Sequence, residues 1–194
     1  FSCEYSVPKF QRFILGRIEA DRSDHMLVGQ LFKISTISAY FHISHGFKNI
    51  VNDNLIYHTH NESPKAMEIF ANPSVSGIFY WAEIHRQVRF QGNAKKADAK
   101  ISDEYFKSRP RGGQLSAWAS AQSNIISSRE DVTNRIEELD KEYEDKEIPR
   151  PDFWGGFSIE VNYWEFWQGR RNRTHDRFSY KQEDTSWKIE RMSP

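Results

Sequence analysis

The residues best suited to chemistry lie in the C-terminal third of the chain, where aromatic, amide and cationic side chains gather. Residues 154–157 read Trp-Gly-Gly-Phe, residues 164–169 read Trp-Glu-Phe-Trp-Gln-Gly, and residues 173–177 read Arg-Thr-His-Asp-Arg. Aromatic faces stack on a flat ring, amides hydrogen-bond its edge, and guanidinium groups bind phosphate. The cluster therefore favours a phosphorylated aromatic ligand. By themselves, the alternating aromatics also fit core packing, and residues 173–177 also fit a charged hairpin.

Two further segments carry candidate binding residues. Residues 108–114 read Ser-Arg-Pro-Arg-Gly-Gly-Gln, which places two planar guanidinium groups on a turn whose backbone can approach a ligand. The alternative there is a solvated turn between two helices. Residues 86–89 read Arg-Gln-Val-Arg, a strand pattern with side chains on alternate faces. The alternative there is an ordinary strand with exposed Arg.

The helices and strands that must position these residues are predicted from hydrophobic periodicity and from residues that begin or end such elements. Strands are expected within 26–44, 55–57, 75–81, 87–95 and, three or four of them, within 154–191, with a polar loop at 49–54. Helices are expected over 8–20, from Ser63-Pro64 to Asn72-Pro73, over 102–108 with Ser102 as its cap, and over 114–122. A longer helix begins with the capping-box pair Ser127 and Glu130 and carries the apolar stripe Val132, Ile136, Leu139 and Tyr143.

Strands at both ends and helices in the middle make an α+β pattern, so we expect an antiparallel sheet or barrel rather than a Rossmann fold. We expect one domain over 1–194, with an N-terminal helical segment at 1–25, the first barrel strands at 26–100, a helical middle at 101–147 and the C-terminal strands at 148–194.

Composition excludes several classes of function. Lys plus Arg and Asp plus Glu each number 27, so there is no basic field for nucleic acid, and an anion site must be local. The single cysteine, Cys3, fits a reducing compartment, and we expect a cytoplasmic protein. No apolar run reaches membrane-spanning length. Because the chain begins with Phe1 rather than Met, we expect a fragment or a trimmed chain, with room for a targeting segment upstream.

The histidines do not make a metal site that the sequence can support. His25, His42, His58, His60 and His85 are candidates, and His58 and His60 would share one strand face. No Cys or carboxylate completes a recognisable ligand set, so we expect no metal. The sequence also lacks a Gly-x-Gly-x-x-Gly fingerprint, a P-loop and a nucleophile elbow.

From about Ser63 to Pro194 the chain resembles the pyridoxamine 5'-phosphate oxidase family. The resemblance rests on Tyr105 to Ser123, on the C-terminal aromatic and Arg-rich segments described above, on Phe79-Tyr80-Trp81, and on the ending Trp187-Lys-Ile-Glu-Arg-Met-Ser-Pro. It implies an antiparallel FMN-binding split β-barrel with helices packed outside, assembled as a homodimer with FMN sites at the subunit interface. The implied activity is oxidation of pyridoxamine or pyridoxine 5'-phosphate to pyridoxal 5'-phosphate, with O₂ as the acceptor.

The resemblance also implies roles for individual residues. FMN contacts fall on Thr59, Lys65, Gln87, Gln122, Ser123, Trp167 and Arg177. Substrate contacts fall on Tyr105, Arg109, Arg173, His175 and His45, and among these Arg173 and His175 are the catalytic candidates that position the reacting carbon. Residues 173, 175 and 177 would share one face at the start of a strand, with Thr174 on the other face.

The chain departs from the family pattern at several phosphate contacts. Tyr40 and Pro64 stand where the family has Arg, His45 where it has Lys, and Gly113 where it has Ser. Compensation is available from the helix N-terminus at Ser63-Pro64, which offers free N–H groups, and from the charge of Lys65. The alternative function is a non-catalytic relative that binds pyridoxal phosphate or has lost FMN. An FMN reductase or a haem-handling split barrel is disfavoured by Arg109 and the segment 173–177.

Overall fold

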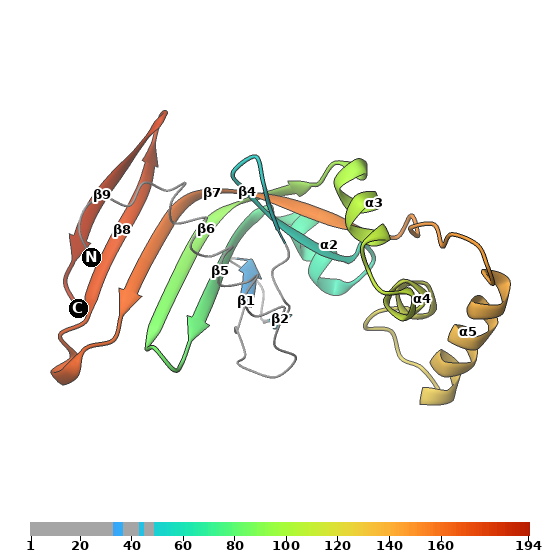
Figure 1. Ribbon diagram of the computed structural model, residues 1–194. Coiled ribbons are helices and arrows are strands. Elements are labelled where there is room, and N and C mark those ends of the chain that lie inside the picture. Colours follow the sequence, from blue (N-terminus) through green and yellow to red (C-terminus); the bar gives the residue numbers. More distant parts are fainter. Residues whose placement is uncertain (1–32, 37–42, 45–48) are drawn as a thin grey trace. The chain divides into compact units, whose positions relative to one another are not determined.

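The computed structural model describes residues 33–36, 43–44 and 49–194 (Figure 1). The helix expected over 8–20, most of the strand region 26–44, the site candidate His45 and the departure from the family pattern at Tyr40 lie outside the described residues. The chain forms two compact units. Unit 1 comprises the described residues up to Tyr57 together with Asn72–Ala94 and Ser158–Pro194, and unit 2 comprises His58–Ala71 and Lys95–Phe157. One domain over 1–194 stays a prediction.

Unit 1 is built on strands of a nine-stranded sheet. The strands are β1 (Lys33–Thr36), β2 (Ile43–Ser44), β3 (Asn49–Val51), β4 (Asn54–His60), β5 (Ser74–Trp81), β6 (Arg86–Lys96), β7 (Trp154–Gln168), β8 (Asp176–Glu183) and β9 (Ser186–Met192). Their order is β2-β1-β5-β6-β7-β4-β3, and β8 pairs with β7 and β9. The pairs β1–β2, β1–β5, β3–β4, β5–β6, β7–β8 and β8–β9 are antiparallel. The expected strands at 75–81 and 87–95 are confirmed, and three strands follow Trp154.

The polar loop expected at 49–54 is wrong, because Asn49–Val51 pairs with Asn54–Ile56 as a hairpin. The two turn residues, Asn52 and Asp53, have φ of 49° and 64°. Asn and Asp tolerate this left-handed region, and two such residues make the tight turn that matches the twist of paired strands. β3 ends the order of the sheet, where polar side chains keep access to water.

Four described helices belong to unit 2: α2 (Pro64–Ala71), α3 (Ala99–Lys107), α4 (Arg111–Ala119) and α5 (Arg129–Glu142). α2 begins at Pro64 and ends before Asn72-Pro73, as predicted, because proline fits the first helical position but cannot continue a helix. α4 begins at Arg111, three residues earlier than expected. Pro110 stands at its N-cap position, so Pro110 and not the glycine pair marks its start.

The caps predicted for α3 and α5 are wrong, and the observed caps lie a few residues away along the chain. Asp98 caps α3 and accepts a bond from the Lys100 N–H, whereas Ser102 lies inside the helix and is buried. The Ser102 hydroxyl accepts from the Gly156 N–H at 3.1 Å, so it bonds to the first part of β7 instead. The capping box of α5 is Ser128 with Asp131, one residue after the predicted pair.

Apolar faces of α3, α4 and α5 form the core of unit 2 together with Ile148 and Trp154, and the helical residues are Phe106, Leu115, Ala117 and Leu139. Three of the four residues of the predicted stripe belong to this core, since Leu139 is buried and Ile136 and Tyr143 pack against it, whereas Val132 is not part of the cluster. In unit 1, β5 alternates between buried and half-buried residues and contributes Val75, Phe79 and Trp81 to the core. Within the part of the chain that the structure describes, no helix has the length and apolar character needed to cross a bilayer.

Candidate cofactor and substrate site

Lys65, Gln122 and Thr59 form a polar cluster in unit 2. The Lys65 ammonium donates to Gln122 Oε1 at 2.5 Å, and the Thr59 hydroxyl donates to the same oxygen at 3.2 Å. Because both donors require an acceptor, the Gln122 side chain must present its oxygen to them and its NH₂ group elsewhere. The cluster thus brings together three residues expected to bind FMN and leaves the Gln122 amide donors available to a ligand. Ser123 follows with an exposed side chain and φ of 70°.

Lys65 is a buried cation without a carboxylate partner among the described residues. Its side chain lies in the first turn of α2 with 8% of the residue exposed, and burial lowers the pKa of its ammonium. An unpaired charge in such a place is costly unless an anion offsets it. The free N–H groups expected at this helix start are fewer than predicted. Pro64 has none, and the N–H groups of Ala66 and Met67 both donate to the Ser63 carbonyl.

Arg109 is a second desolvated cation of unit 2 that lacks a carboxylate partner among the described residues. Its Nη1 atom is buried with no hydrogen-bond partner among the residues that the structure describes, and burial lowers the pKa of the guanidinium. The guanidinium carbon lies 5.1 Å from the ring centre of Trp154 and 5.8 Å from that of Phe106. Arg111, two residues on, is instead paired with Asp140 at 2.8 Å. Of the two arginines of this turn, Arg109 is therefore the one whose charge has no carboxylate partner among the described residues.

Aromatic rings line the neighbourhood of Arg109. Tyr105 stacks on His58 with ring centres 4.3 Å apart, and His58 stacks on Trp154 at 5.2 Å and 8°. His58 entered the sequence reasoning only as a metal candidate, and its burial between two rings gives it a packing role instead. No local signal could have found this role, because the three residues come from separate elements. Among the described residues there is no group of three or more potential metal ligands.

In unit 1, strands β6, β7 and β8 place several predicted FMN residues on one face of the sheet. Trp167 is the register partner of Arg177, so these two side chains are neighbours on the same face. Glu165 shares that face because it lies two residues before Trp167. The Arg89 guanidinium reaches Glu165 at 3.6 Å, and Gln87, two residues before Arg89, shares its face. The face thus offers a flat ring, an amide and two guanidinium groups.

Glu165 is the buried carboxylate of this face. It is 3% exposed, and its Oε1 accepts from Nε and Nη2 of Arg177 at 3.1 and 3.0 Å. Arg177 Nη1 also donates to the Ser193 carbonyl at 3.0 Å. Burial, and secondarily the charge of Glu165, raises the pKa of Tyr163, whose hydroxyl points to Met192 Sδ at 3.7 Å.

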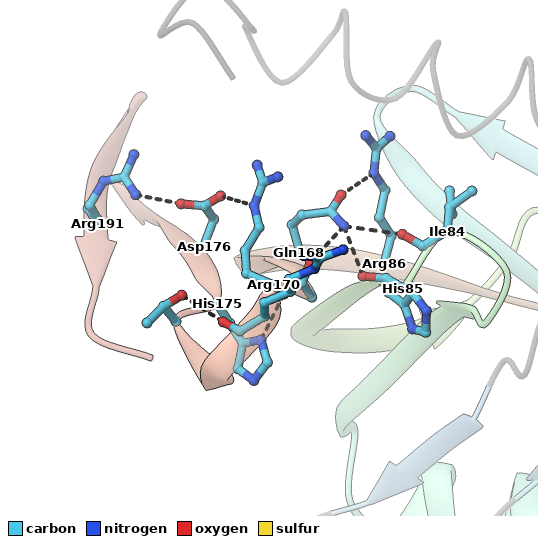
Figure 2. A network of polar contacts seen from close by, with 11 residues as sticks. Ile84, His85, Arg86, Gln168, Arg170, His175, Asp176 and Arg191 are labelled. Carbon is cyan, nitrogen blue, oxygen red and sulfur yellow. Dashed lines mark hydrogen bonds and ion pairs between the residues drawn. The ribbon is translucent and has the colours of Figure 1, made fainter.

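The segment that carries Arg173 and His175 is held against the β5–β6 turn by Gln168 (Figure 2). Gln168 Oε1 accepts from Arg86 Nε at 2.6 Å, while its NH₂ group donates to the carbonyls of Ile84, His85 and Gly169. Gly169 is required here, because an added Cβ would lie 2.9 Å from the His85 Cβ. The contacts clamp the end of β7 to the turn before β6.

His175 is fixed by a backbone hydrogen bond. The Arg170 N–H donates to His175 Nδ1 at 3.1 Å, so the neutral ring carries its proton on Nε2. Its ring lies 4.7 Å from that of Trp167. Asp176 joins the same segment to β9 by accepting from Arg170 Nε and Arg191 Nη1, both at 2.9 Å (Figure 2).

The expected strand start at Arg173 is wrong. Arg171–Arg173 form a short 3₁₀ turn, η1, in which Asn172 and Arg173 have φ of 55° and 59°, and β8 begins at Asp176. Strand alternation therefore does not place Arg173 and His175 on one face. Thr174 instead closes the turn, since its hydroxyl donates to the Arg171 carbonyl at 2.9 Å.

Comparisons with known proteins agree on one family. Residues 34–141 match the family described as pyridoxamine 5'-phosphate oxidase, and residues 154–194 match the pyridoxine 5'-phosphate oxidase C-terminal dimerisation region. The pyridoxine/pyridoxamine 5'-phosphate oxidase of Rippkaea orientalis is 49% identical over 144 residues, covering 74% of this chain and 68% of that protein. That of Rubrobacter xylanophilus is 46% identical over 139 residues, covering 72% and 64%. The matched segments thus span about two thirds of these relatives.

Solved structures confirm the α+β split-barrel fold expected from the sequence. PhzG from Burkholderia lata, in complex with tetrahydrophenazine-1-carboxylic acid, has a TM-score of 0.84 and 23% identity, covering 100% of this chain and 95% of that one. A pyridoxamine 5'-phosphate oxidase-related, FMN binding protein from Nostoc punctiforme has a TM-score of 0.73 and 14% identity, covering 98% and 100%. With the family match over more than half of its length, this chain belongs to the pyridoxamine 5'-phosphate oxidase family.

Proposed function

We propose that this chain, with FMN bound, oxidises pyridoxamine or pyridoxine 5'-phosphate to pyridoxal 5'-phosphate and uses O₂ as the acceptor. Family membership supports the proposal. The observation that carries it is the presence in unit 2 of two desolvated cations, Lys65 and Arg109, that have no carboxylate partner among the described residues. A cofactor and a substrate that each bear a phosphate would supply the two anions that these cations lack.

The residues assigned to FMN fit the chemistry of a phosphorylated ring. The Lys65 ammonium suits the phosphate, and the NH₂ group of Gln122, left over after its oxygen accepts two bonds, suits an acceptor on the ring edge. The full assigned set is Thr59, Lys65, Gln87, Gln122, Ser123, Trp167 and Arg177. When bound, FMN supplies the redox chemistry, taking up a hydride equivalent from the substrate and returning the electrons to O₂ with release of hydrogen peroxide.

The substrate is held at two ends in this proposal. Arg109 and Tyr105 bind its phosphate, and Arg173 and His175 orient the carbon that is oxidised. Because His175 Nδ1 already accepts a backbone N–H, only its Nε2–H is available, so neutral His175 acts as a hydrogen-bond donor to the substrate. Preorganised positioning of this kind contributes to the rate by reducing the entropy lost at the reaction step.

We also propose that the protein works as a homodimer, and the match of residues 154–194 to a dimerisation region supports this. The same residues contain Trp167, Arg173, His175 and Arg177. Loss of the dimer is therefore expected to weaken ligand binding along with assembly. Sedimentation with and without FMN would test the link, and a fully active monomer would contradict it.

A non-catalytic relative is the second candidate function. The observation that favours it is the start of α2, where Ser63 O accepts two of the first N–H groups and Pro64 has none, which leaves few free donors for an FMN phosphate. On this alternative, Arg109 binds the phosphate of pyridoxal phosphate and the protein does not oxidise a substrate.

Titration of the flavin-free protein with FMN, followed by peroxide release from pyridoxamine phosphate, separates the two candidates. We expect saturable quenching of flavin fluorescence and peroxide formation. Lys65→Met should weaken FMN binding roughly ten- to a hundredfold, the effect of losing one charge-assisted contact. Lys107→Met is the matched control, because Lys107 is 65% exposed and paired with Glu147. No saturable binding at high micromolar FMN would refute the oxidase proposal, and binding without peroxide would favour the relative.

A further inference from the structure

The buried carboxylate of unit 1 has no role among the ligand contacts assigned above. Glu165 lies between two aromatic positions of β7 and is 3% exposed. Carboxylates are almost never fully buried unless they are paired. Both of its oxygens are used here, since Oε1 accepts two bonds from Arg177 and Oε2 lies 3.6 Å from Arg89. The Glu165 carboxylate is therefore held in place by partners on two neighbouring strands.

Arg177 is held by this carboxylate in one orientation. Nε and Nη2 both donate to Glu165 Oε1, and Nη1 donates to the Ser193 carbonyl. Three of its five N–H donors are therefore engaged, and one on Nη1 and one on Nη2 have no partner within the described part of the chain. The guanidinium is planar, so three fixed donors determine where the other two point.

We infer that Glu165 is a positioning residue for flavin binding, which fixes the Arg177 guanidinium so that its two remaining donors face the ligand. The inference rests on the proposed FMN role of Arg177. Glu165 itself touches no ligand in this scheme. It acts from the middle of the face that also carries Gln87 and Trp167, so one buried carboxylate sets the geometry of a side chain from β8 and restrains another, Arg89, from β6.

Glu165 was not among the residues selected from the sequence. Within Trp-Glu-Phe-Trp-Gln-Gly it reads as the exposed position of an alternating strand. Its burial depends on two arginines that lie 76 residues before it and 12 residues after it along the chain.

A double-mutant cycle tests this inference. FMN affinity would be measured for Glu165→Ala, Arg177→Ala and the double variant. Glu190→Ala is the control, because the Glu190 side chain is exposed and forms a surface ion pair with Lys188. We expect each single variant to weaken FMN binding about tenfold or more, and the double variant to be no weaker than Arg177→Ala, since a residue that acts through another adds nothing once the other is gone. The control should bind as wild type.

The outcomes separate the inference from the proposed function. If Arg177→Ala leaves FMN affinity unchanged, the FMN role of Arg177 fails. If Arg177→Ala weakens binding but Glu165→Ala does not, or if the two losses add, the positioning role fails. Glu165→Gln keeps the shape and one acceptor oxygen, so it should retain the fold and restore part of the affinity lost in Glu165→Ala. The visible circular dichroism of bound flavin should change in Glu165→Gln, and an unchanged band with wild-type affinity would also overturn the inference.

Discussion

Replacing Arg109 with Met separates a substrate-binding role for this side chain from a structural one. Its buried Nη1 atom has no hydrogen-bond partner among the described residues, and such an unsatisfied donor costs about 1–3 kcal/mol. Its contacts over the rings of Trp154 and Phe106 contribute about 0.5–1 kcal/mol each. The two effects nearly cancel, and Met retains the apolar contacts of the stem. We therefore expect the free energy of unfolding to change by less than about 1 kcal/mol.

Arg150→Met is the matched control in the same unit. Arg150 donates from Nε to Asp103 at 2.6 Å and from Nη1 to the carbonyls of Trp154 and Pro151 at 2.6 and 3.3 Å. The variant loses all of these bonds and leaves the buried Trp154 carbonyl without this donor. We expect it to lower the free energy of unfolding by about 3 kcal/mol. The difference between the two changes in the free energy of unfolding distinguishes a cation that stabilises the fold from a cation that binds a ligand.

Urea unfolding of both variants and steady-state kinetics of Arg109→Met provide the measurements. The KM for pyridoxamine phosphate should rise roughly ten- to a hundredfold, because one charge-assisted phosphate contact is lost, while FMN affinity stays near that of wild type. The reasoning is refuted if Arg109→Met loses as much stability as Arg150→Met, or if KM does not change. In the first case Arg109 is structural, and in the second it does not bind the substrate phosphate.

Two further predictions concern the surroundings of these cations. Burial lowers the pKa of His60 below its usual 6.5, so below that pH the unfolded chain binds more protons, and the free energy of unfolding should fall as pH drops below about 6.5. His60→Gln should flatten this slope in urea unfolding, and an equally steep slope would assign it to another group. Gly113 lies inside α4, where an added Cβ would sit 3.5 Å from Arg109 Nη2, so Gly113→Ser should raise stability by about 0.5 kcal/mol and lower the KM for pyridoxamine phosphate. An unchanged KM would show that position 113 does not reach the phosphate.

Helix boundaries could be predicted correctly where a proline sets them. The predicted boundary was wrong where two neighbouring side chains could each cap the helix. Pro64 and the Asn72-Pro73 pair fix both ends of α2, because proline permits a helix start and forbids its continuation. At α5, Ser127 and Ser128 each have an acidic residue three positions on, so the sequence contains two overlapping capping boxes. The structure uses the second, and Asp131 also accepts from the Ser127 N–H at 3.2 Å. Local pattern finds such a helix start but cannot choose between adjacent caps.

Two predictions from local pattern were wrong. The polar residues 49–54 were predicted to form a loop, and residues 173–175 were predicted to start a strand. Asn52 and Asp53 adopt positive φ, which turns a polar stretch into a hairpin. Asn172 and Arg173 also adopt positive φ, which interrupts the expected strand alternation. In both places the backbone conformation of two residues decided the outcome, and the polarity or alternation of the whole stretch did not. The roles proposed for Arg173 and His175 consequently rest on the turn geometry rather than on a shared strand face.

Buried charges in this protein are of two kinds: those paired within the protein and those without a carboxylate partner among the described residues. Glu165 is buried with two arginines around it, so its charge is neutralised within unit 1. Lys65 and Arg109 are desolvated in unit 2 with no carboxylate partner among the described residues. Burying an unpaired charge destabilises a fold, and such residues persist where a ligand supplies the missing partner. The balanced composition of 27 cations and 27 anions hides this difference, because it depends on which charges meet in space.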